Sequence, residues 1–270
     1  MTQPDRSVTL DSWERLRGYT AARIAIGHCG ISVPTREHLS FQLCHALARD
    51  AVHAALGVEA LKRNIDRIPG SPVSRRTLIL HSEARDRIEY LQRPDLGRKL
   101  SVASREILKA EEAKGSGAYD IALVAGDGLS ALAIETNAVP FLEELLPLLE
   151  SRKYALSPIC LVQQSRVAAA DEIAFLLNAR AAVILIGERP GLSSPDSMGI
   201  YMTWNPDPGV TRDDQRNCIS NVRPEGMSPR LAAEKLTYLL DKSFRLRLSG
   251  VGLKDDQSES LPRVDGEMTG

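Results

Sequence analysis

The sequence predicts an α/β protein in which a helical N-terminal region precedes a mainly parallel β-sheet flanked by helices. Three runs, at residues 119–128, 157–165 and 181–188, are apolar along most of their length instead of alternating with polar residues. This pattern is typical of strands that are buried on both faces of a parallel sheet. Segments with helical periodicity separate these runs, as in repeated βαβ units.

The composition is that of an ordinary globular protein, with 43% hydrophobic and 26% charged residues in a chain of 270. A net charge of −1 gives no basic field to attract a polyanion, and aromatic residues, at 4%, are too few for a nucleic-acid stacking platform. No apolar run reaches the roughly 18 residues of a membrane span, and the N-terminus lacks the apolar core of a signal peptide. We therefore expect a cytoplasmic protein that binds neither nucleic acid nor membranes.

The cysteines and histidines do not predict a metal site. No two cysteines form a CxxC pair, which argues against both a zinc site and a disulfide framework. Three histidines lie within one predicted helix, none four residues from another, and we interpret them as structural. The residues concerned are Cys29, Cys44, Cys160, Cys218, His38, His45 and His53.

The first 115 residues are predicted to be mainly helical. A long helix is expected at 36–56, because Thr35 is a suitable N-cap, apolar residues follow at helical spacing, and Gly57 ends the run. A short helix is expected near 10–17 and a short strand at 77–80. We divide this part of the chain into a flexible segment, 1–20, and a mainly helical domain, 21–115.

A basic turn lies within the helical region. Arg93, Arg98 and Lys99 surround Pro94 and Gly97, and their charges are suited to holding an anion, such as a phosphate or the carboxylate of a partner. The alternative is a solvated surface loop, which the sequence favours.

A Gly-Ser-Gly stretch at 115–117 marks the expected boundary of a second domain, 116–253, followed by a disordered tail, 254–270. Within the domain, helical segments are expected at 129–153, with an interruption near Pro140, and at 166–179. A further strand is expected at 199–204, and a helix begins at Ser228 and Pro229, which form a good N-cap and first-turn pair.

Polar, glycine-rich loops follow the predicted strands at Gly126–Gly128, 163–167 and 187–197, and the segment 216–221 follows the strand at 199–204. In an open α/β sheet, ligands bind beyond the carboxyl ends of the strands. Glycines permit close backbone approach, and Gln, Ser and Asn offer neutral hydrogen bonds. We therefore predict a large, amide-rich or nucleotide-like ligand; the alternative for 187–197 is a long surface turn.

Known enzyme fingerprints are absent. No GxGxxG or GxxxxGK[ST] motif supports NAD or ATP binding, and no GxSxG motif marks a serine nucleophile. All five histidines precede residue 82, so none can serve as a base in the predicted crevice. A hydrolase that is complete in this chain is not expected.

Several long motifs resemble one family. The runs LIGERPGLSSPDSMGIYMTW, RNCISNVRPEGMS and LSGVGLKD are similar to the small subunit of ethanolamine ammonia-lyase. Earlier runs fit the same family in order: ARIAIGHCG, VPTREHLSFQLCHALARDAVH, YLQRPDLGRKLS and ALVAGDGLSALAIETNAVPFLEEL. The resemblance covers about residues 20 to 255.

The resemblance implies a function. Enzymes of this family convert ethanolamine to acetaldehyde and ammonia by radical chemistry, with adenosylcobalamin held between large and small subunits in a hetero-oligomer. The family's small subunit has a helical N-terminal part and a Rossmann-like domain that holds the corrin and its nucleotide tail. Carried over by motif, the cobalamin contacts fall on Val167 in QQSRV, Glu188 in IGERPG and Cys218 in RNCISN. Catalysis would belong to the large subunit, with no catalytic residue on this chain.

The mode of cobalamin binding can also be inferred. The histidine loop DxHxxG of base-off cobalamin proteins is missing, since Asp50 and His53 give only DxxH within a helix. We therefore expect base-on cobalamin. Two other hypotheses are a nucleotide-dependent Rossmann-type enzyme and a structural subunit that does not touch the cofactor. Packaging in a bacterial microcompartment is common in this family, and the short N-terminus leaves it open here.

Overall fold

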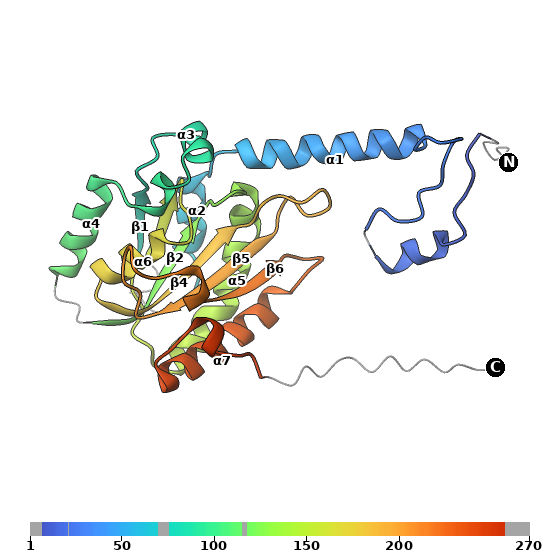
Figure 1. Cartoon of the computed structure of the whole chain (residues 1–270). Coiled ribbons are helices and arrows are strands. Elements are labelled where there is room, and N and C mark those ends of the chain that lie inside the picture. The colour runs from blue at the N-terminus through green and yellow to red at the C-terminus, as the bar shows by residue number, and fades with distance from the viewer. Residues whose placement is uncertain (1–6, 21, 70–75, 115–117, 257–270) are drawn as a thin grey trace.

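The computed structural model describes residues 7–20, 22–69, 76–114 and 118–256. Its centre is a six-stranded sheet with helices on both faces (Figure 1), in the strand order β1-β3-β2-β4-β5-β6. The strands are β1 (Thr77–His81), β2 (Tyr119–Gly126), β3 (Ile159–Gln163), β4 (Ala179–Gly187), β5 (Met198–Trp204) and β6 (Arg216–Val222). This arrangement confirms the predicted α/β class, with an approximately Rossmann-like sheet.

The sheet is parallel over four strands and antiparallel at one edge. β1, β3, β2 and β4 run parallel, and each predicted apolar run forms one of the last three. β5 and β6 are antiparallel to their neighbours. The expectation that segment 216–221 is a crevice loop was wrong, because it lies within β6. Only one side of this edge strand is covered, so Ile219 is buried while Cys218 and Ser220 are exposed, and its mixed composition resembles that of a loop.

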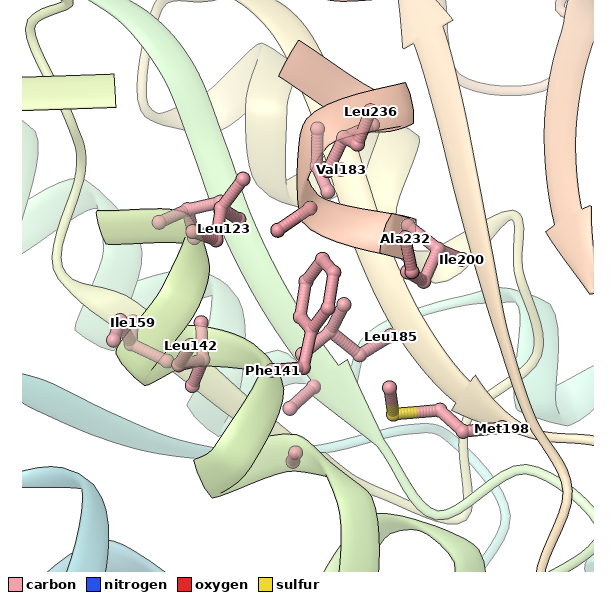
Figure 2. Packing of buried hydrophobic residues seen from close by; sticks show 14 of the residues in the cluster. Leu123, Phe141, Leu142, Ile159, Val183, Leu185, Met198, Ile200, Ala232 and Leu236 are labelled. Atoms are coloured by element: carbon pink, nitrogen blue, oxygen red, sulfur yellow. The ribbon is translucent and has the colours of Figure 1, made fainter. Parts of the chain in front are cut away.

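Two layers of helix cover the sheet. α2 (Val58–Ile65), α5 (Ala131–Ser151) and α7 (Pro229–Leu246) pack on one face, and α4 (Val102–Glu112) and α6 (Ala169–Leu176) on the other. Figure 2 shows Phe141 of α5 in the first layer, close to Leu185 of β4 and Ala232 of α7. Burying such a large aromatic side chain contributes about 1.5–3 kcal/mol.

Helix α5 corrects the expected interruption near Pro140. The helix is continuous from Ala131 to Ser151 and contains both Pro140 and Pro147. Both prolines lie on its exposed side, whereas ten other residues of the helix are buried. A proline inside a helix costs about 3 kcal/mol, and the apolar face that α5 packs against the sheet and α7 outweighs this cost.

Helix α1 (Thr35–His53) confirms the long helix expected at 36–56 and extends away from the sheet (Figure 1). Three of the leucines that predicted it are exposed, with exposed fractions of 58% for Leu39, 61% for Leu43 and 51% for Leu47. Before it, the chain forms a 3-10 turn, η1 (Glu14–Tyr19), where a short helix was expected slightly earlier. The remaining short elements are α3 (Arg87–Gln92), η2 (Leu96–Arg98), η3 (Asp213–Gln215) and η4 (Gly250–Gly252).

The sheet contains strands from both sides of the expected domain boundary. β1 pairs along its whole length with β3, so residues 77–81 belong to the same sheet as the strands after residue 118. The Gly-Ser-Gly stretch at 115–117 lies outside the described residues. Residues 1–6 of the segment expected to be flexible and residues 257–270 of the tail expected to be disordered also lie outside them. None of the described helices has the length and apolarity to cross a membrane.

Candidate functional site

The order of the strands places three loops together. β3 and β4 lie on opposite sides of β2, so the chain changes direction across the sheet after β2. Such a switch point opens a crevice at the carboxyl ends of the strands. A pocket of about 310 Å³ lies there, and all three loops contribute to it. Its lining consists of Tyr90, Gly128, Leu129, Arg166, Val167, Ile186, Gly187, Glu188, Arg189 and Tyr201.

Asp127 holds two of these loops together from below. It is fully buried after β2, and its carboxylate accepts the main-chain N–H groups of Gln164 at 2.9 Å and Ser165 at 3.0 Å. These bonds fix Gln164 in a left-handed conformation with φ of 57°. Arg87 donates to the carbonyl oxygen of Gly128 at 2.8 Å and lies 3.4 Å from Asp127. Asp127 therefore shapes the loop that carries Val167 and does not itself face the pocket.

Burial and hydrogen bonding act in opposite directions on Asp127. Burial raises the pKa of its carboxyl group, while the N–H groups of Gln164 and Ser165 and the nearby Arg87 favour the charged form and oppose that shift. Burial also lowers the pKa of Arg87, and the negative charge of Asp127 opposes this shift.

The glycines at the strand ends allow the loops to pack against one another. From the sequence, we expected these glycines to let a ligand approach the backbone. A Cβ atom on Gly128, whose φ is 53°, would lie 2.3 Å from the carbonyl oxygen of Gly187. One on Gly187 would lie 2.0 Å from the carbonyl oxygen of Ser130, and one on Gly126 would lie 2.0 Å from the Ser165 hydroxyl. Each glycine is needed because another part of this protein occupies the space.

Tyr90 forms the floor on the side of α3. Its ring is fully buried, and its hydroxyl donates to the carbonyl oxygen of Ser165 at 2.9 Å. The guanidinium carbons of Arg87 and Arg166 lie 4.9 and 4.4 Å from the ring centroid. Burial strongly raises the pKa of Tyr90, so the phenol remains a neutral donor.

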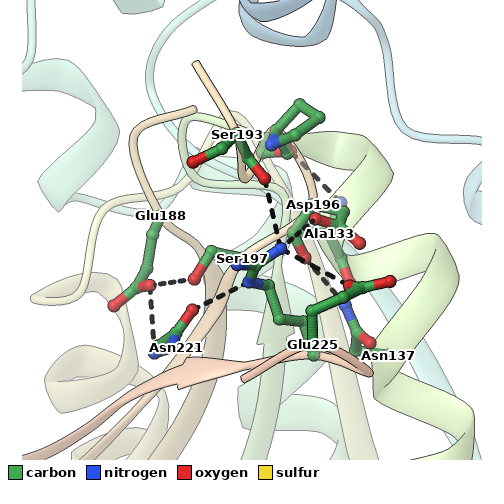
Figure 3. A network of polar contacts seen from close by, with 11 residues as sticks. Ala133, Asn137, Glu188, Ser193, Asp196, Ser197, Asn221 and Glu225 are labelled. Carbon is green, nitrogen blue, oxygen red and sulfur yellow. Dashed lines mark hydrogen bonds and ion pairs between the residues drawn. The ribbon is translucent and has the colours of Figure 1, made fainter. Parts of the chain in front are cut away.

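Glu188 connects the long loop after β4 to the edge strand β6 (Figure 3). Its carboxylate accepts the hydroxyl groups of Ser197 and Ser220 and the main-chain N–H of Asn221, the last at 3.2 Å. Arg223 extends this network by donating to Asn221 Oδ1 at 2.9 Å. The segment 187–197 is thus held by side-chain hydrogen bonds, in contrast to the alternative of a simple surface turn.

The structure brings the three predicted cobalamin contacts to the same region. Val167 and Glu188 line the pocket directly. Cys218 lies opposite Tyr201 in the register of β5 and β6, and Tyr201 lines the pocket. Desolvation by the neighbouring strand raises the pKa of the Cys218 thiol, although its hydrogen bond with Tyr201 opposes the shift. Their contact with a cofactor remains a prediction.

Three residues of the site received no individual role from the sequence. Tyr90 lies in the run YLQRPDLGRKLS, far from the strand loops, and only the fold brings it under Ser165. Tyr201 belongs to a strand that was predicted without a role in the site. Arg166 lies inside QQSRV, and its positive charge next to Val167 was the available signal.

The side chains that line the pocket are better suited to binding a ligand than to acid–base catalysis. Of the ten described residues that line the pocket, none is a histidine, cysteine, lysine or aspartate. Leu129, Val167 and Ile186 provide an apolar wall, while Tyr201, Arg166 and Arg189 provide donors. Nowhere in the described part of the chain do three or more His, Cys, Asp or Glu side chains cluster as metal ligands would.

Known proteins are similar along nearly the whole chain. A family model described as ethanolamine ammonia-lyase light chain (EutC) matches residues 10–254. A protein of Azotobacter vinelandii named ethanolamine ammonia-lyase small subunit is 52% identical, over 98% of this chain and 96% of its own. A Xanthomonas campestris protein with the same name is 50% identical, over 94% and 92%. The chain belongs to the family of ethanolamine ammonia-lyase small subunits.

Proposed function

We propose that this chain is the cofactor-holding small subunit of an adenosylcobalamin-dependent ethanolamine ammonia-lyase, which converts ethanolamine to acetaldehyde and ammonia. The observation that carries the proposal is the family match over residues 10–254, which includes every loop of the pocket. Relatives at 52% and 50% identity are named as small subunits of this lyase. Sequence features alone suggest the cytoplasm as its compartment.

The chemistry of the pocket suits a corrinoid. A corrin ring has a flat apolar face and a rim of neutral amide arms. Val167, Ile186 and Leu129 offer the apolar wall, while the Tyr201 hydroxyl and the Arg189 guanidinium offer donors for amide oxygens. The Glu188 carboxylate can accept from amide N–H groups. When bound, adenosylcobalamin supplies the radical chemistry, and the residues of this chain bind and orient it.

The size of the pocket supports a composite site. Pockets for drug-sized ligands have volumes of about 300–1,000 Å³ and enclose most of the ligand. This pocket, at about 310 Å³, is at the lower limit of that range, and a corrinoid with its nucleotide tail is much larger than such a ligand. We infer that a larger partner subunit encloses the rest of the cofactor and contributes the catalytic groups.

A surface for that partner lies in the N-terminal arm, which we define as residues 7–50. Of its 43 described residues, 32 are exposed, and a stable interface uses about 20–30 residues on each side. The arm also displays large apolar side chains, including Leu39, Leu43 and Leu47. Helices in proteins gain most of their stability from packing of an apolar face, so the exposed apolar side chains of α1 favour a partner that covers them. We propose that the larger subunit covers this arm.

The proposal is tested by reconstitution. This chain alone should show negligible deamination of ethanolamine, and activity should appear when the larger subunit and adenosylcobalamin are added. The complex should also acquire the visible spectrum of a bound corrinoid. Full activity of the isolated chain, or a complex that gains activity without a corrinoid, would contradict the proposal.

A further inference from the structure

Arg166 carries a positive charge for which the described residues supply no counter-ion. It follows β3, its main-chain N–H donates to the carbonyl oxygen of Gly97 at 2.7 Å, and its guanidinium stacks on Tyr90. Its Nε atom is buried and has no hydrogen-bond partner. Within the described part of the chain, no carboxylate lies at ion-pair distance from it. Arg216, in contrast, donates two hydrogen bonds of 2.6 Å to Asp171.

Arg98 brings a second charge to the same place. It ends η2, and the turn before it packs tightly on the site, because a Cβ on Gly97 would lie 2.8 Å from the Tyr90 ring. Arg98 lies 3.8 Å from Asp213, and the two side chains are 55% and 82% exposed. Exposed ion pairs of this kind contribute little to stability, so an incoming anion can compete with Asp213 for Arg98.

The two arginines line one pocket. This second pocket, of about 250 Å³, is formed by Pro94, Arg98, Arg166, Val167, Ala168 and Asp213. Arg166 and Val167 also line the 310 Å³ pocket at the switch point, so the two pockets share this wall. Asp213 is the one acidic residue among the six, and it also lies 3.5 Å from Arg216. The charge of the second pocket is therefore positive on balance.

We propose that Arg98 and Arg166 form an anion subsite that binds the phosphodiester of the cofactor's nucleotide tail. This inference rests on the proposed function, because it assigns the corrin to the first pocket and its tail to the second. Val167 then lies between the ring and the phosphate. Guanidinium groups bind phosphate oxygens with two parallel hydrogen bonds, and the stacking of Arg166 on Tyr90 fixes the plane of those donors.

The test compares two corrinoids that differ in the tail. Cyanocobalamin carries the phosphodiester, whereas cobinamide has the same ring without it. The complex of both subunits is titrated with each, and affinity is read from the change in visible absorbance. Arg98→Gln and Arg166→Gln should each weaken cyanocobalamin binding about tenfold or more, as for a lost charged hydrogen bond. Arg98 lines only the second pocket, so Arg98→Gln should leave cobinamide binding unchanged, whereas Arg166→Gln, which lines both pockets, should weaken cobinamide binding less than cyanocobalamin binding.

A matched control comes from the same turn. Arg93 is exposed, pairs with Asp95 at 2.7 Å and does not line the second pocket, so Arg93→Gln should bind both corrinoids as the wild type does. Inorganic phosphate should compete with cyanocobalamin in the wild type. Phosphate that leaves cyanocobalamin affinity unchanged or tightens it would show that phosphate and the cofactor's tail do not share a site, and would overturn the assignment.

The same titrations distinguish failure of the proposed function from failure of the anion subsite. A wild-type complex that binds neither corrinoid overturns the proposed function and this subsite with it. If the Arg98→Gln and Arg166→Gln complexes bind cyanocobalamin as tightly as the wild-type complex does, the subsite is overturned and the proposed function is not. Equal weakening of both corrinoids by these variants also overturns it, because the arginines would then act on the ring or on the fold.

Discussion

The Tyr90 hydroxyl donates a hydrogen bond of 2.9 Å to the carbonyl oxygen of Ser165, which ties helix α3 to the loop that carries Val167. The donor and the acceptor are 75 residues apart in the sequence. This bond fixes the height of the Val167 loop above the sheet, because Asp127 holds the preceding residue, Gln164, from the other side. The pocket is therefore shaped by contacts beneath it.

Tyr90→Phe should loosen that loop. The buried carbonyl oxygen of Ser165 loses its donor, at a cost of about 1–3 kcal/mol in the free energy of unfolding, measured by urea denaturation. Corrinoid affinity of the complex should fall modestly, because the ring that supports Arg166 remains. An unchanged free energy of unfolding would contradict the role of this hydrogen bond.

Glu188→Ala should weaken cobalamin binding in the complex while the sheet stays folded. The substitution removes the acceptor of Ser197, Ser220 and Asn221, so the long loop loses its connection to β6. Glu188→Gln keeps an acceptor oxygen and should bind better than Glu188→Ala. Titration of the corrin absorbance measures the affinity, and circular dichroism checks the fold; equal affinity of wild type and both variants argues against a role in binding.

Gly128→Ala should prevent correct packing of the strand-end loops. Its Cβ would lie 2.3 Å from the carbonyl oxygen of Gly187, in addition to the cost of a left-handed conformation. Gly209 is the matched control, since its φ is 79° but nothing lies within 4 Å of its Cβ position. Gly209→Ala should cost only about 1 kcal/mol. Similar melting temperatures for the two variants would refute the packing argument.

Glu111→Gln should destabilise the protein in a pH-dependent way. Burial favours the neutral form of Glu111, but its ion pairs with Lys114 and Arg76 outweigh it and lower its pKa. A folded-state pKa below the unfolded value of about 4.5 adds stability above that pH, and this contribution is lost as the pH falls through the folded pKa.

The difference in unfolding free energy between wild type and Glu111→Gln should thus be on the order of 1 kcal/mol at pH 7. It should shrink when the pH falls below 4.5, where the wild-type carboxyl becomes protonated. Paired urea denaturation curves at both pH values measure it, and a difference that grows towards low pH would show the opposite sign.

Replacing Leu39, Leu43 and Leu47 of α1 by serine should weaken assembly with the larger subunit and leave the sheet domain folded. These side chains are exposed in this chain, so their loss costs little until a partner covers them. Phe175, 62% exposed on α6, offers the matched control, and Phe175→Ser should assemble normally. Co-purification of the two subunits measures the effect; equal recovery of both variants would place the interface elsewhere.

Sequence patterns predicted the regular parts of the sheet because local hydrophobicity decides them. The apolar runs at 119–128, 157–165 and 181–188 formed β2, β3 and β4, since strands covered on both faces need apolar residues at nearly every position. The same reasoning failed for β6, where one exposed face makes a strand look like a loop. It also failed at Pro140, where tertiary packing outweighs a local helix breaker.

The candidate site was predictable only in part. Val167 and Glu188 follow predicted parallel strands, whose carboxyl ends meet at one edge of a sheet, so the sequence indicated that they lie near each other. Tyr90 could not be placed, because its partner Ser165 is remote in the chain and pairing of β1 with β3 brings them together.

By itself, the sequence determined the fold class, the main strands and helices, and the family, because these depend on local periodicity and on long motifs. Only the tertiary structure decided what each residue of IGERPG and QQSRV does. It placed Glu188 in a hydrogen-bond network with β6 and assigned the glycines to packing between loops. It also left the buried Nε of Arg166, beside Val167, without a hydrogen-bond partner among the described residues. The reason is physical: a charge or a glycine acquires its role from atoms that lie near it in space, and these atoms come from strands far apart in the chain.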